Sequence, residues 1–288
     1  MRPSKNTLLY TAYIIGITVL FLYYLFPSDA VKDYVAYKMS LENPDISITI
    51  DHVSPVLPPG INLHDVGIAH GDKVLIDLDS VKITPGWLSV FSSTKTTNFK
   101  GRLNAGTVDG TTQVDSSSEQ GAEKIEGTIS GVHVQGIPAL QGLTAHNISG
   151  SLCGDFIIAG PWPNRSMTGQ LTLSDSRISF DQPVIGLPSL EFIKIDADLA
   201  LNKGNLAIKK LSARGNQLDA DISGTIALNE GGPQNALNLN GSISPHHGFL
   251  AKMKNSIPAS FLLQRKAGNT AISFTIGGTV EAPAFRLN

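Results

Sequence analysis

The chain of 288 residues is short of basic charge and of cysteine, and each shortage excludes a class of function. Its 22 lysines and arginines are balanced by 24 acidic residues, so it has no basic excess to neutralise nucleic-acid phosphates, and we expect no nucleic-acid partner. Cys153 is the only cysteine, which excludes an intramolecular disulfide and a cysteine-based metal cluster. We expect this thiol to be a small buried apolar group.

Common catalytic and metal-binding motifs are also missing. The sequence has no phosphate loop with its lysine, no HExxH and no GxSxG, and its 7 histidines are scattered, so we expect no enzyme activity, metal or cofactor. Asp196 with Asp198, and Asp219 with Asp221, stand two residues apart. This spacing of roughly 7 Å would suit a pair of glycosidase carboxylates. Because both pairs lie on the predicted wet face of a strand, we interpret them as solvated surface groups.

One long uncharged run stands near the N-terminus, at residues 7–26 (TLLYTAYIIGITVLFLYYLF). As a helix it would span about 30 Å, the thickness of a hydrocarbon core. Four tyrosines lie toward its ends, where such rings favour the membrane interface: Tyr10, Tyr13, Tyr23 and Tyr24. The alternative is a signal peptide cleaved after "SDA" at 28–30, but the run exceeds the usual signal core of about 7–15 residues. We therefore predict an uncleaved transmembrane helix.

Flanking charges predict the orientation of this helix. Arg2 and Lys5 precede it, which favours a cytoplasmic N-terminus and places the rest of the chain outside the cytoplasm. The expected segments are a cytoplasmic tail at 1–6, the transmembrane helix at 7–26, a linker helix at 27–44 and a β-rich domain at 45–288.

From Ile46 onward, apolar residues recur at every second position, which predicts strands with one apolar and one polar face. Polar breaks such as "NKGN" at 202–205 separate the runs, whereas 115–123 and 244–266 look irregular, the latter with one short helix. The candidate apolar face comprises Ile193, Ile195, Leu199, Leu201, Leu218, Ile222, Ile226, Leu228, Ile272, Phe274 and Ile276. Because antiparallel sheets commonly leave one face wet, we predict an all-β antiparallel domain.

Seven glycines share a local pattern in which a polar residue and then Ile, Leu or Val follow. They are Gly106, Gly127, Gly150, Gly169, Gly224, Gly241 and Gly278. One interpretation is that they mark bulges or bends at which a long sheet curls. The other is that Gly, Ser and Thr are simply frequent in this chain.

The apolar face of such a sheet must be covered, and three arrangements achieve this. The sheet can fold over as a sandwich, close on itself, or remain a curled trough that holds something apolar. The alternation alone does not choose between them, although we expect the face to be largely closed by the chain's own strands or by partner subunits.

Two blocks of the sequence resemble the type II secretion system protein N family and, more distantly, AsmA-like periplasmic proteins. The first is 57–93, which contains "DVGI", "LDSVKI" and "WLSVF" in that order. The second is 149–288, which contains "GQLTLSDSRISF" and ends "FTIGGTVEAPAFRLN". The likeness lies in the order of these motifs and in the chain length, and the segment 104–131 has no specific match.

The resemblance implies a single-pass protein of the bacterial inner membrane with a periplasmic β-rich domain. It would be a non-enzymatic scaffold or accessory component for the export of folded proteins, with other secretion subunits as partners. The AsmA-like resemblance implies the alternative, an elongated, curled β-groove that binds or transfers lipid across the periplasm. Neither family brings catalytic residues to this chain.

A lysine in place of Ile15 tests the predicted membrane helix. A charge near the centre of the helix should raise the insertion free energy by about 2.5–3.5 kcal/mol. We expect Ile15→Lys to reduce the fraction of protein that stays with membranes after alkaline extraction, whereas Ile15→Leu should not. Full retention of Ile15→Lys would show that residues 7–26 are not the main attachment.

Overall fold

The computed structural model describes most of the chain. The described residues are 5–42, 45–57, 59–71, 73–87, 89, 92–115, 123–142, 146–160, 165–184, 187–228, 236–246, 271–279 and 282–287. Most of the two irregular segments predicted at 115–123 and 244–266 lies outside these residues, and so does the short helix expected in the second.

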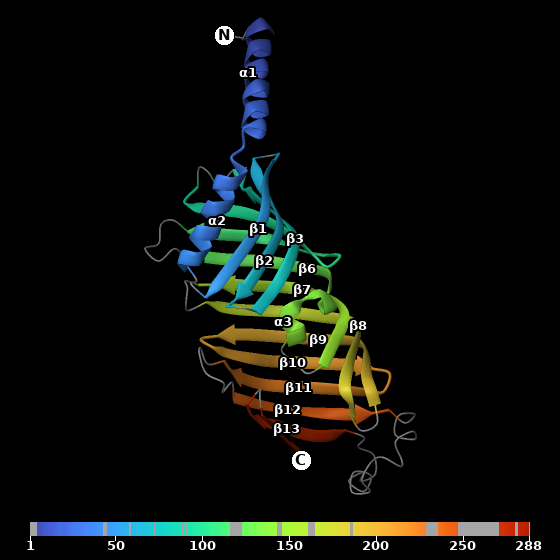
Figure 1. Ribbon diagram of the computed structural model, residues 1–288. Helices are drawn as coiled ribbons and strands as arrows, with labels where there is room; N and C mark the ends of the chain where they lie inside the picture. The colour runs from blue at the N-terminus through green and yellow to red at the C-terminus, as the bar shows by residue number, and fades with distance from the viewer. Residues whose placement is uncertain are drawn as a thin grey trace.

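Fourteen strands make up most of the described structure (Figure 1). They are β1 (Ile46–Val56), β2 (Gly60–His70), β3 (Lys73–Pro85), β4 (Thr94–Leu103), β5 (Gly106–Asp115), β6 (Glu123–His133), β7 (His146–Ala159), β8 (Ser166–Val184), β9 (Leu187–Asn202), β10 (Asn205–Gly215), β11 (Leu218–Ala227), β12 (Ala236–Pro245), β13 (Ile272–Gly278) and β14 (Pro283–Leu287). The helical elements are α1 (Lys5–Tyr24), α2 (Ser28–Glu42), the 3-10 turn η2 (Val134–Gly136) and α3 (Pro138–Gly142).

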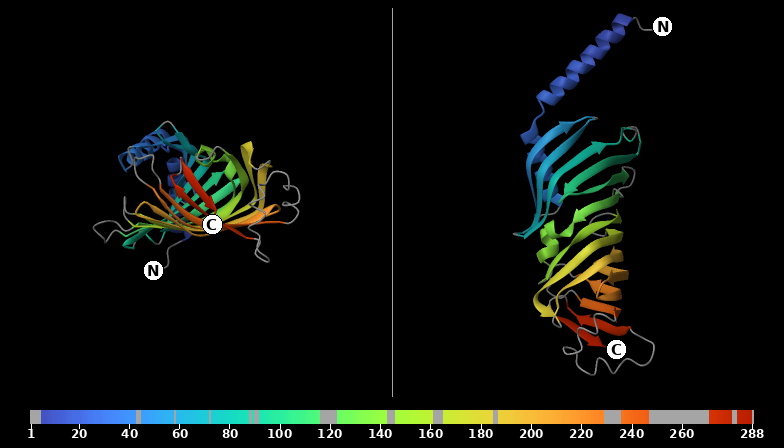
Figure 2. Two further views of the ribbon diagram at one scale, coloured as in Figure 1. Left: turned by 90° about the horizontal axis from the view of Figure 1, so that it is seen from below. Right: turned by 90° about the vertical axis from the view of Figure 1, so that its right-hand side faces the viewer.

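All fourteen strands belong to one sheet, and each pairs with its neighbours in the chain. Each pairing between neighbouring strands is antiparallel, which confirms the predicted antiparallel, mostly β domain. The strands succeed one another along the molecule from the helices to the C-terminal end (Figure 2). The strand order identifies an open sheet, and it does not establish the curled groove or sandwich expected from the sequence.

The predicted turn at "NKGN" is confirmed as a tight hairpin between β9 and β10. Asn202 pairs with Asn205, and the two residues between them have left-handed backbones, with φ of 46° at Lys203 and 74° at Gly204. Two successive left-handed residues are typical of the hairpin turns that match the twist of antiparallel strands.

Helix α1 stands apart from the sheet (Figure 1). Its described apolar side chains, from Leu9 to Phe21, are exposed around the helix, and so are the predicted interface residues Tyr10, Tyr13, Tyr23 and Tyr24. Lys5 is its first residue, whereas Arg2 lies outside the described residues. Among the residues described, no helix combines the length and the apolar character required of a membrane span, so the predicted transmembrane helix is not confirmed.

Helix α2 matches the predicted linker helix and packs on the first strands. Val31 and Val35, with Phe26 before the helix, contact a buried cluster of Ile50, Val53, Leu63 and Val66 from β1 and β2. Full burial of such a side chain contributes about 1.5–3 kcal/mol. The contact therefore joins α2 firmly to the start of the sheet.

Side chains of the same helix form hydrogen bonds with backbone groups on the free edge of β1. The Ser28 hydroxyl donates to the Val53 carbonyl at 2.7 Å and accepts from the Val53 N–H at 3.2 Å. Lys32 donates to the Asp51 carbonyl at 3.1 Å. These bonds occupy backbone groups that would otherwise invite pairing with another strand.

A second buried cluster covers the middle of the sheet. Leu103 of β4, Val132 of β6 and Ile137 before α3 form its centre, and Ile76 and Leu78 of β3 pack against them. Side chains of α3 complete the cover. This part of the apolar face is thus closed by the chain's own elements.

Two of the repeated glycines lie beneath aromatic rings. A Cβ on Gly127 would come within 2.4 Å of the Phe156 ring, and one on Gly241 within 2.5 Å of the Phe274 ring. Two others, Gly150 and Gly224, lie beside register shifts, with φ of 145° and 143°. The glycines therefore serve two purposes: Gly127 and Gly241 leave room for an aromatic ring from the next strand, and Gly150 and Gly224 lie at local bulges.

Alanine at Gly127 tests the first purpose, with Gly169 as its control. Both glycines flank Phe156, but a Cβ on Gly169 would meet nothing closer than 3.6 Å. We expect Gly127→Ala to lower the free energy of unfolding by about 1–3 kcal/mol through overpacking. Gly169→Ala should be neutral or stabilising by up to about 1 kcal/mol. Urea midpoints followed by circular dichroism measure both, and equal effects would contradict the role of the ring.

Candidate functional site on the apolar face of the sheet

Four rows of apolar residues cross strands β8 to β12, perpendicular to the strand direction, and three of them continue onto β13. The strand register aligns them without a charged or polar member. The first two rows are Met167, Leu201, Leu206, Ile226, Leu237, and then Gly169, Leu199, Ile208, Gly224, Leu239, Ile276. The other two are Leu171, Ala197, Leu211, Ile222, Gly241, Phe274, and then Leu173, Ile195, Ala213, Ala220, Ile243, Ile272. We call this surface the row face.

A bulge in β10 keeps the rows aligned. The sequence "IKKL" at 208–211 breaks the two-residue period, because two lysines stand where one polar residue is expected. Ile208 pairs with Gly224, whereas Leu211 pairs with Ile222, so β10 has one extra residue in between. The bulge returns Leu211 to the apolar side, which a regular strand would not do.

The row face is only partly buried. Apart from Gly169, Ala213, Leu239 and Phe274, which are buried, its residues are intermediate in exposure. Within the described parts of the chain, β9 to β13 make substantial contacts only with their neighbours in the sheet. No described helix or strand therefore covers the row face in the way that α2 and α3 cover the earlier strands.

Most of the predicted apolar residues belong to the row face. They are Ile195, Leu199, Leu201, Ile222, Ile226, Ile272, Phe274 and Ile276. Leu218 begins β11 and is half-buried, and Leu228 follows the last residue of β11 with 38% of its surface exposed.

Ile193 does not lie on the row face, and its predicted position was wrong. It is 60% exposed, whereas its neighbour Phe192 is 7% exposed and lies over Gly215. The reason is an irregularity in both strands at this point. Arg214 of β10 pairs with Lys194 but Gly215 pairs with Phe192, so Ile193 is an extra residue in β9. On β8, Asp175 has a left-handed backbone with φ of 48°, and the pairing with β7 shifts by one residue between Ser174 and Arg177.

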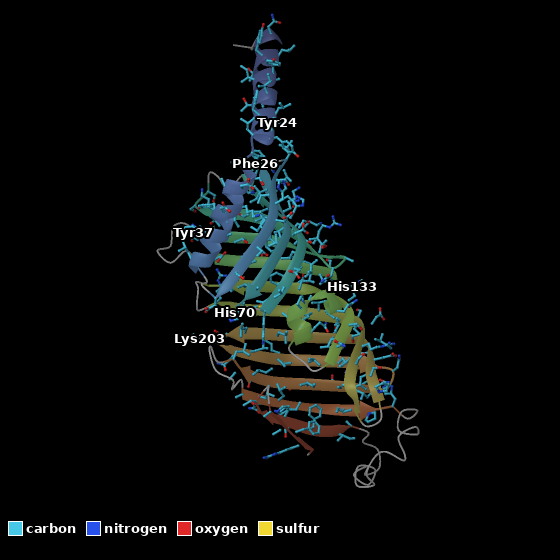
Figure 3. The ribbon with its side chains drawn as sticks, in the orientation of Figure 1. Tyr24, Phe26, Tyr37, His70, His133 and Lys203 are labelled. Carbon is cyan, nitrogen blue, oxygen red and sulfur yellow. The ribbon has the colours of Figure 1, made fainter. Side chains whose placement is uncertain are left out.

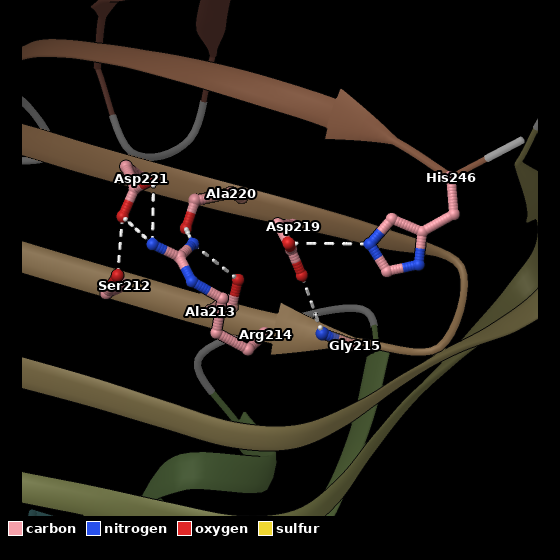
Figure 4. A network of polar contacts seen from close by, with 8 residues as sticks. All are labelled: Ser212, Ala213, Arg214, Gly215, Asp219, Ala220, Asp221 and His246. Carbon is pink, nitrogen blue, oxygen red and sulfur yellow. Dashed lines mark hydrogen bonds and ion pairs between the residues drawn. The ribbon is translucent and has the colours of Figure 1, made fainter. Parts of the chain in front are cut away.

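The opposite face of the same strands is polar and carries an ion-pair network (Figure 4). Arg214 donates to both carboxylate oxygens of Asp221 at 2.9 and 3.1 Å, and Ser212 also donates to Asp221. Asp219 accepts from the Gly215 N–H at 3.2 Å, and its carboxylate lies 3.4 Å from the His246 ring. The two aspartates thus have local partners on an open surface.

The other predicted carboxylate pair is held in the same way. Asp196 accepts from Thr172 at 2.7 Å and pairs with Lys194 at 2.9 Å, while Asp198 lies 3.7 Å from Lys209. A shallow depression of about 500 Å³ contains Asp196, Asp198 and Arg214. Its charges are mixed, and in the described chain no cluster of metal-ligating side chains is found.

These contacts lower the pKa of two carboxyl groups below the usual value. The hydrogen bond from Arg214, and then that from Ser212, lowers the pKa of Asp221. The hydrogen bond from Thr172, and then that from Lys194, lowers the pKa of Asp196. Both carboxylates are therefore ionised at neutral pH, which suits a surface ion pair better than a proton donor.

Cys153 is exposed, which contradicts the expectation that it is buried. It alternates with Leu152 and Gly154 on β7, whose partners Leu173 and Leu171 belong to the row face. The thiol therefore lies on the polar side, where its sulfur accepts from the Gly131 N–H at 3.3 Å.

Comparison of the chain with protein-family models, with curated proteins and with solved structures finds no match.

Removal of the Arg214 guanidinium tests the electrostatics of the polar face. We expect Arg214→Met to raise the pKa of Asp221 toward about 3.9, the ordinary value for aspartate. Because the folded-state pKa is depressed, the stabilisation is present above about pH 4 and is lost as the pH falls through the folded-state pKa. Both side chains are about half exposed, so the loss should stay below about 1 kcal/mol.

Carboxyl chemical shifts measured by NMR across acid pH report each aspartate separately. The control is Thr172→Val, which should raise the pKa of Asp196 and leave that of Asp221 unchanged. An unchanged Asp221 titration in Arg214→Met would contradict the assignment.

Proposed function

We propose that this chain is a non-enzymatic lipid-binding protein whose row face holds the acyl chains of a membrane lipid. The observation that carries the proposal is the row face itself: four uninterrupted apolar rows that no described element covers. Half-exposed apolar side chains that gather over neighbouring strands are typical of a binding surface. The absence of any polar side chain within the rows favours a ligand without hydrogen-bonding groups along its length.

The dimensions of the row face support a hydrocarbon chain as the ligand. Neighbouring strands lie about 4.8 Å apart, so the rows from β8 to β13 extend for about 24 Å. One leaflet of a bilayer is about 15 Å of hydrocarbon. An acyl chain laid along a row, from strand to strand, would contact apolar side chains over its whole length.

A ligand that covers the exposed part of the row-face side chains would gain binding free energy from their burial. Full burial of a Leu, Ile or Phe side chain contributes about 1.5–3 kcal/mol, so a half-buried one retains on the order of 1 kcal/mol to be gained. Several neighbouring side chains covered at once would give favourable binding even after the ordering of the chain is subtracted.

We further propose that the protein is attached to the bacterial inner membrane through α1, with a cytoplasmic N-terminus and a periplasmic sheet. The uncharged run at 7–26 supports this, and so do the apolar side chains exposed around α1. Apolar side chains exposed around a helix gain free energy when an apolar environment covers them.

A second role, as an accessory component of the type II secretion system, is favoured by one observation. Tyr34, Tyr37 and Leu41 are exposed on α2, at the three- and four-residue spacing that forms a single stripe. A stripe of this kind is suited to contact with an apolar groove of another protein subunit.

Photocrosslinking in the intact membrane distinguishes the two roles. Benzoylphenylalanine is introduced at Leu199 or Ile222, both on the row face, and at Ile193, which is exposed but off it. After irradiation of cells that make the full chain, we expect lipid adducts at Leu199 and Ile222, detected by mass spectrometry of the purified protein. Ile193 should give few or none.

The adducts also show which proposal fails. Equal lipid labelling at all three positions would contradict a ligand on the row face. Protein adducts at Leu199 and Ile222, in place of lipid, would favour the secretion role and identify the subunit that covers the face.

A further inference from the structure

Large apolar residues gather at the end of the sheet where α1 begins. Leu57, in the turn after β1, is 66% exposed, and Trp87, in the segment after β3, is 61% exposed. Tyr24 and Leu25, which end α1 and lead toward α2, are exposed as well. Tips of this kind are normally polar, so the set is unusual for residues in water.

The strand register places these residues at the same end. Val56 pairs with Gly60 across the β1–β2 turn, and Ile61 pairs with Ile83 near the end of β3. Ser28, at the start of α2, bonds to Val53 near the end of β1. The end of α1, the β1–β2 turn and the segment after β3 are therefore neighbours.

The opposite end of the same strands has a different character. The β2–β3 turn there is "HGDK", residues 70–73, which contains no apolar side chain. Figure 3 shows Tyr24 and Phe26 at the α1 end and His70 at the other. The β2–β3 turn is thus polar, whereas the β1–β2 turn and the segment after β3 each carry a large exposed apolar side chain, Leu57 and Trp87.

We propose that the end of the sheet formed by Leu25, Leu57 and Trp87 rests in the interfacial layer of a lipid bilayer, with the later strands extending away from it. The inference rests on the membrane attachment proposed above, but it does not depend on ligand binding by the row face. Tryptophan and tyrosine favour the headgroup level, where an apolar ring body and a polar N–H or O–H are both satisfied. Leu57 supplies apolar contact beside them.

Fluorescence quenching by brominated lipid tests the contact. The full chain carries two tryptophans, so Trp162→Phe leaves Trp87 as the single reporter. In phosphatidylcholine vesicles brominated near the headgroup end of the acyl chains, we expect Trp87 emission to fall by about twofold relative to unbrominated vesicles, as for a ring at the interface.

Two further single-tryptophan variants, each carrying Trp87→Phe and Trp162→Phe, complete the experiment. Leu57→Trp should be quenched like Trp87. Thr225→Trp, exposed on the polar side of β11, should not be quenched. Equal quenching at 225 would overturn the inference, because the sheet would then lie flat on the membrane.

The outcomes separate this inference from the proposed attachment. Protein that stays with the vesicles while Trp87 and Leu57→Trp remain unquenched contradicts the end-on contact alone. Protein that fails to stay with the vesicles on flotation contradicts both the attachment and the contact.

Discussion

The structure depends on one continuous ladder of backbone hydrogen bonds. Each inner strand satisfies its N–H and C=O groups with the strands before and after it in the chain, so only the two outer edges need other partners. At β1 the Ser28 hydroxyl supplies both bonds to Val53, and α2 covers the adjoining apolar residues. The ladder begins at a protected edge, and each later strand extends it.

Because side chains alternate along every strand, such a ladder has two faces of opposite character. The bulge at Lys209 and Lys210 preserves this division, since it places both lysines away from the apolar rows. On the other side, Arg214 pairs with Asp221 and Lys194 with Asp196, so the charged groups stabilise one another in solvent. The chemistry of the molecule is therefore sorted by face, with hydrocarbon contact on one side and hydration on the other.

The sequence predicted the strands well, because a period of two is a local signal, and it predicted most residues of the row face for the same reason. It misplaced Ile193, which lies on β9 beside Asp175 of β8. Along β8 the apolar residues stand at odd positions before Asp175 (Leu171, Leu173) and at even positions after it (Ile178, Phe180). This change in the alternation is visible in the sequence and indicates the shift at Asp175. The same change occurs on β2, where Ile61 and Leu63 give way to Val66 and Ile68 around Asp65, whose φ is 49°.

Other features could not be predicted, because they depend on contacts between distant residues. Ile76 and Leu78 of β3 pack against a cluster that includes Val132 of β6, a strand with which β3 does not pair. The exposed position of Cys153 follows only once β7 is set in register with β8. Alternation gives the two faces of a strand, whereas the packing of other elements decides which part of a face stays open.

The chain-order pairing of the strands has a consequence for how such a molecule can change in size. A new hairpin inserted between two neighbours would add a pair of strands without reversing the direction or the facing of any other. The apolar rows would simply become longer by two residues each. Duplication or loss of hairpins can therefore change the length of the sheet in small steps, much as the number of repeats sets the length of a solenoid.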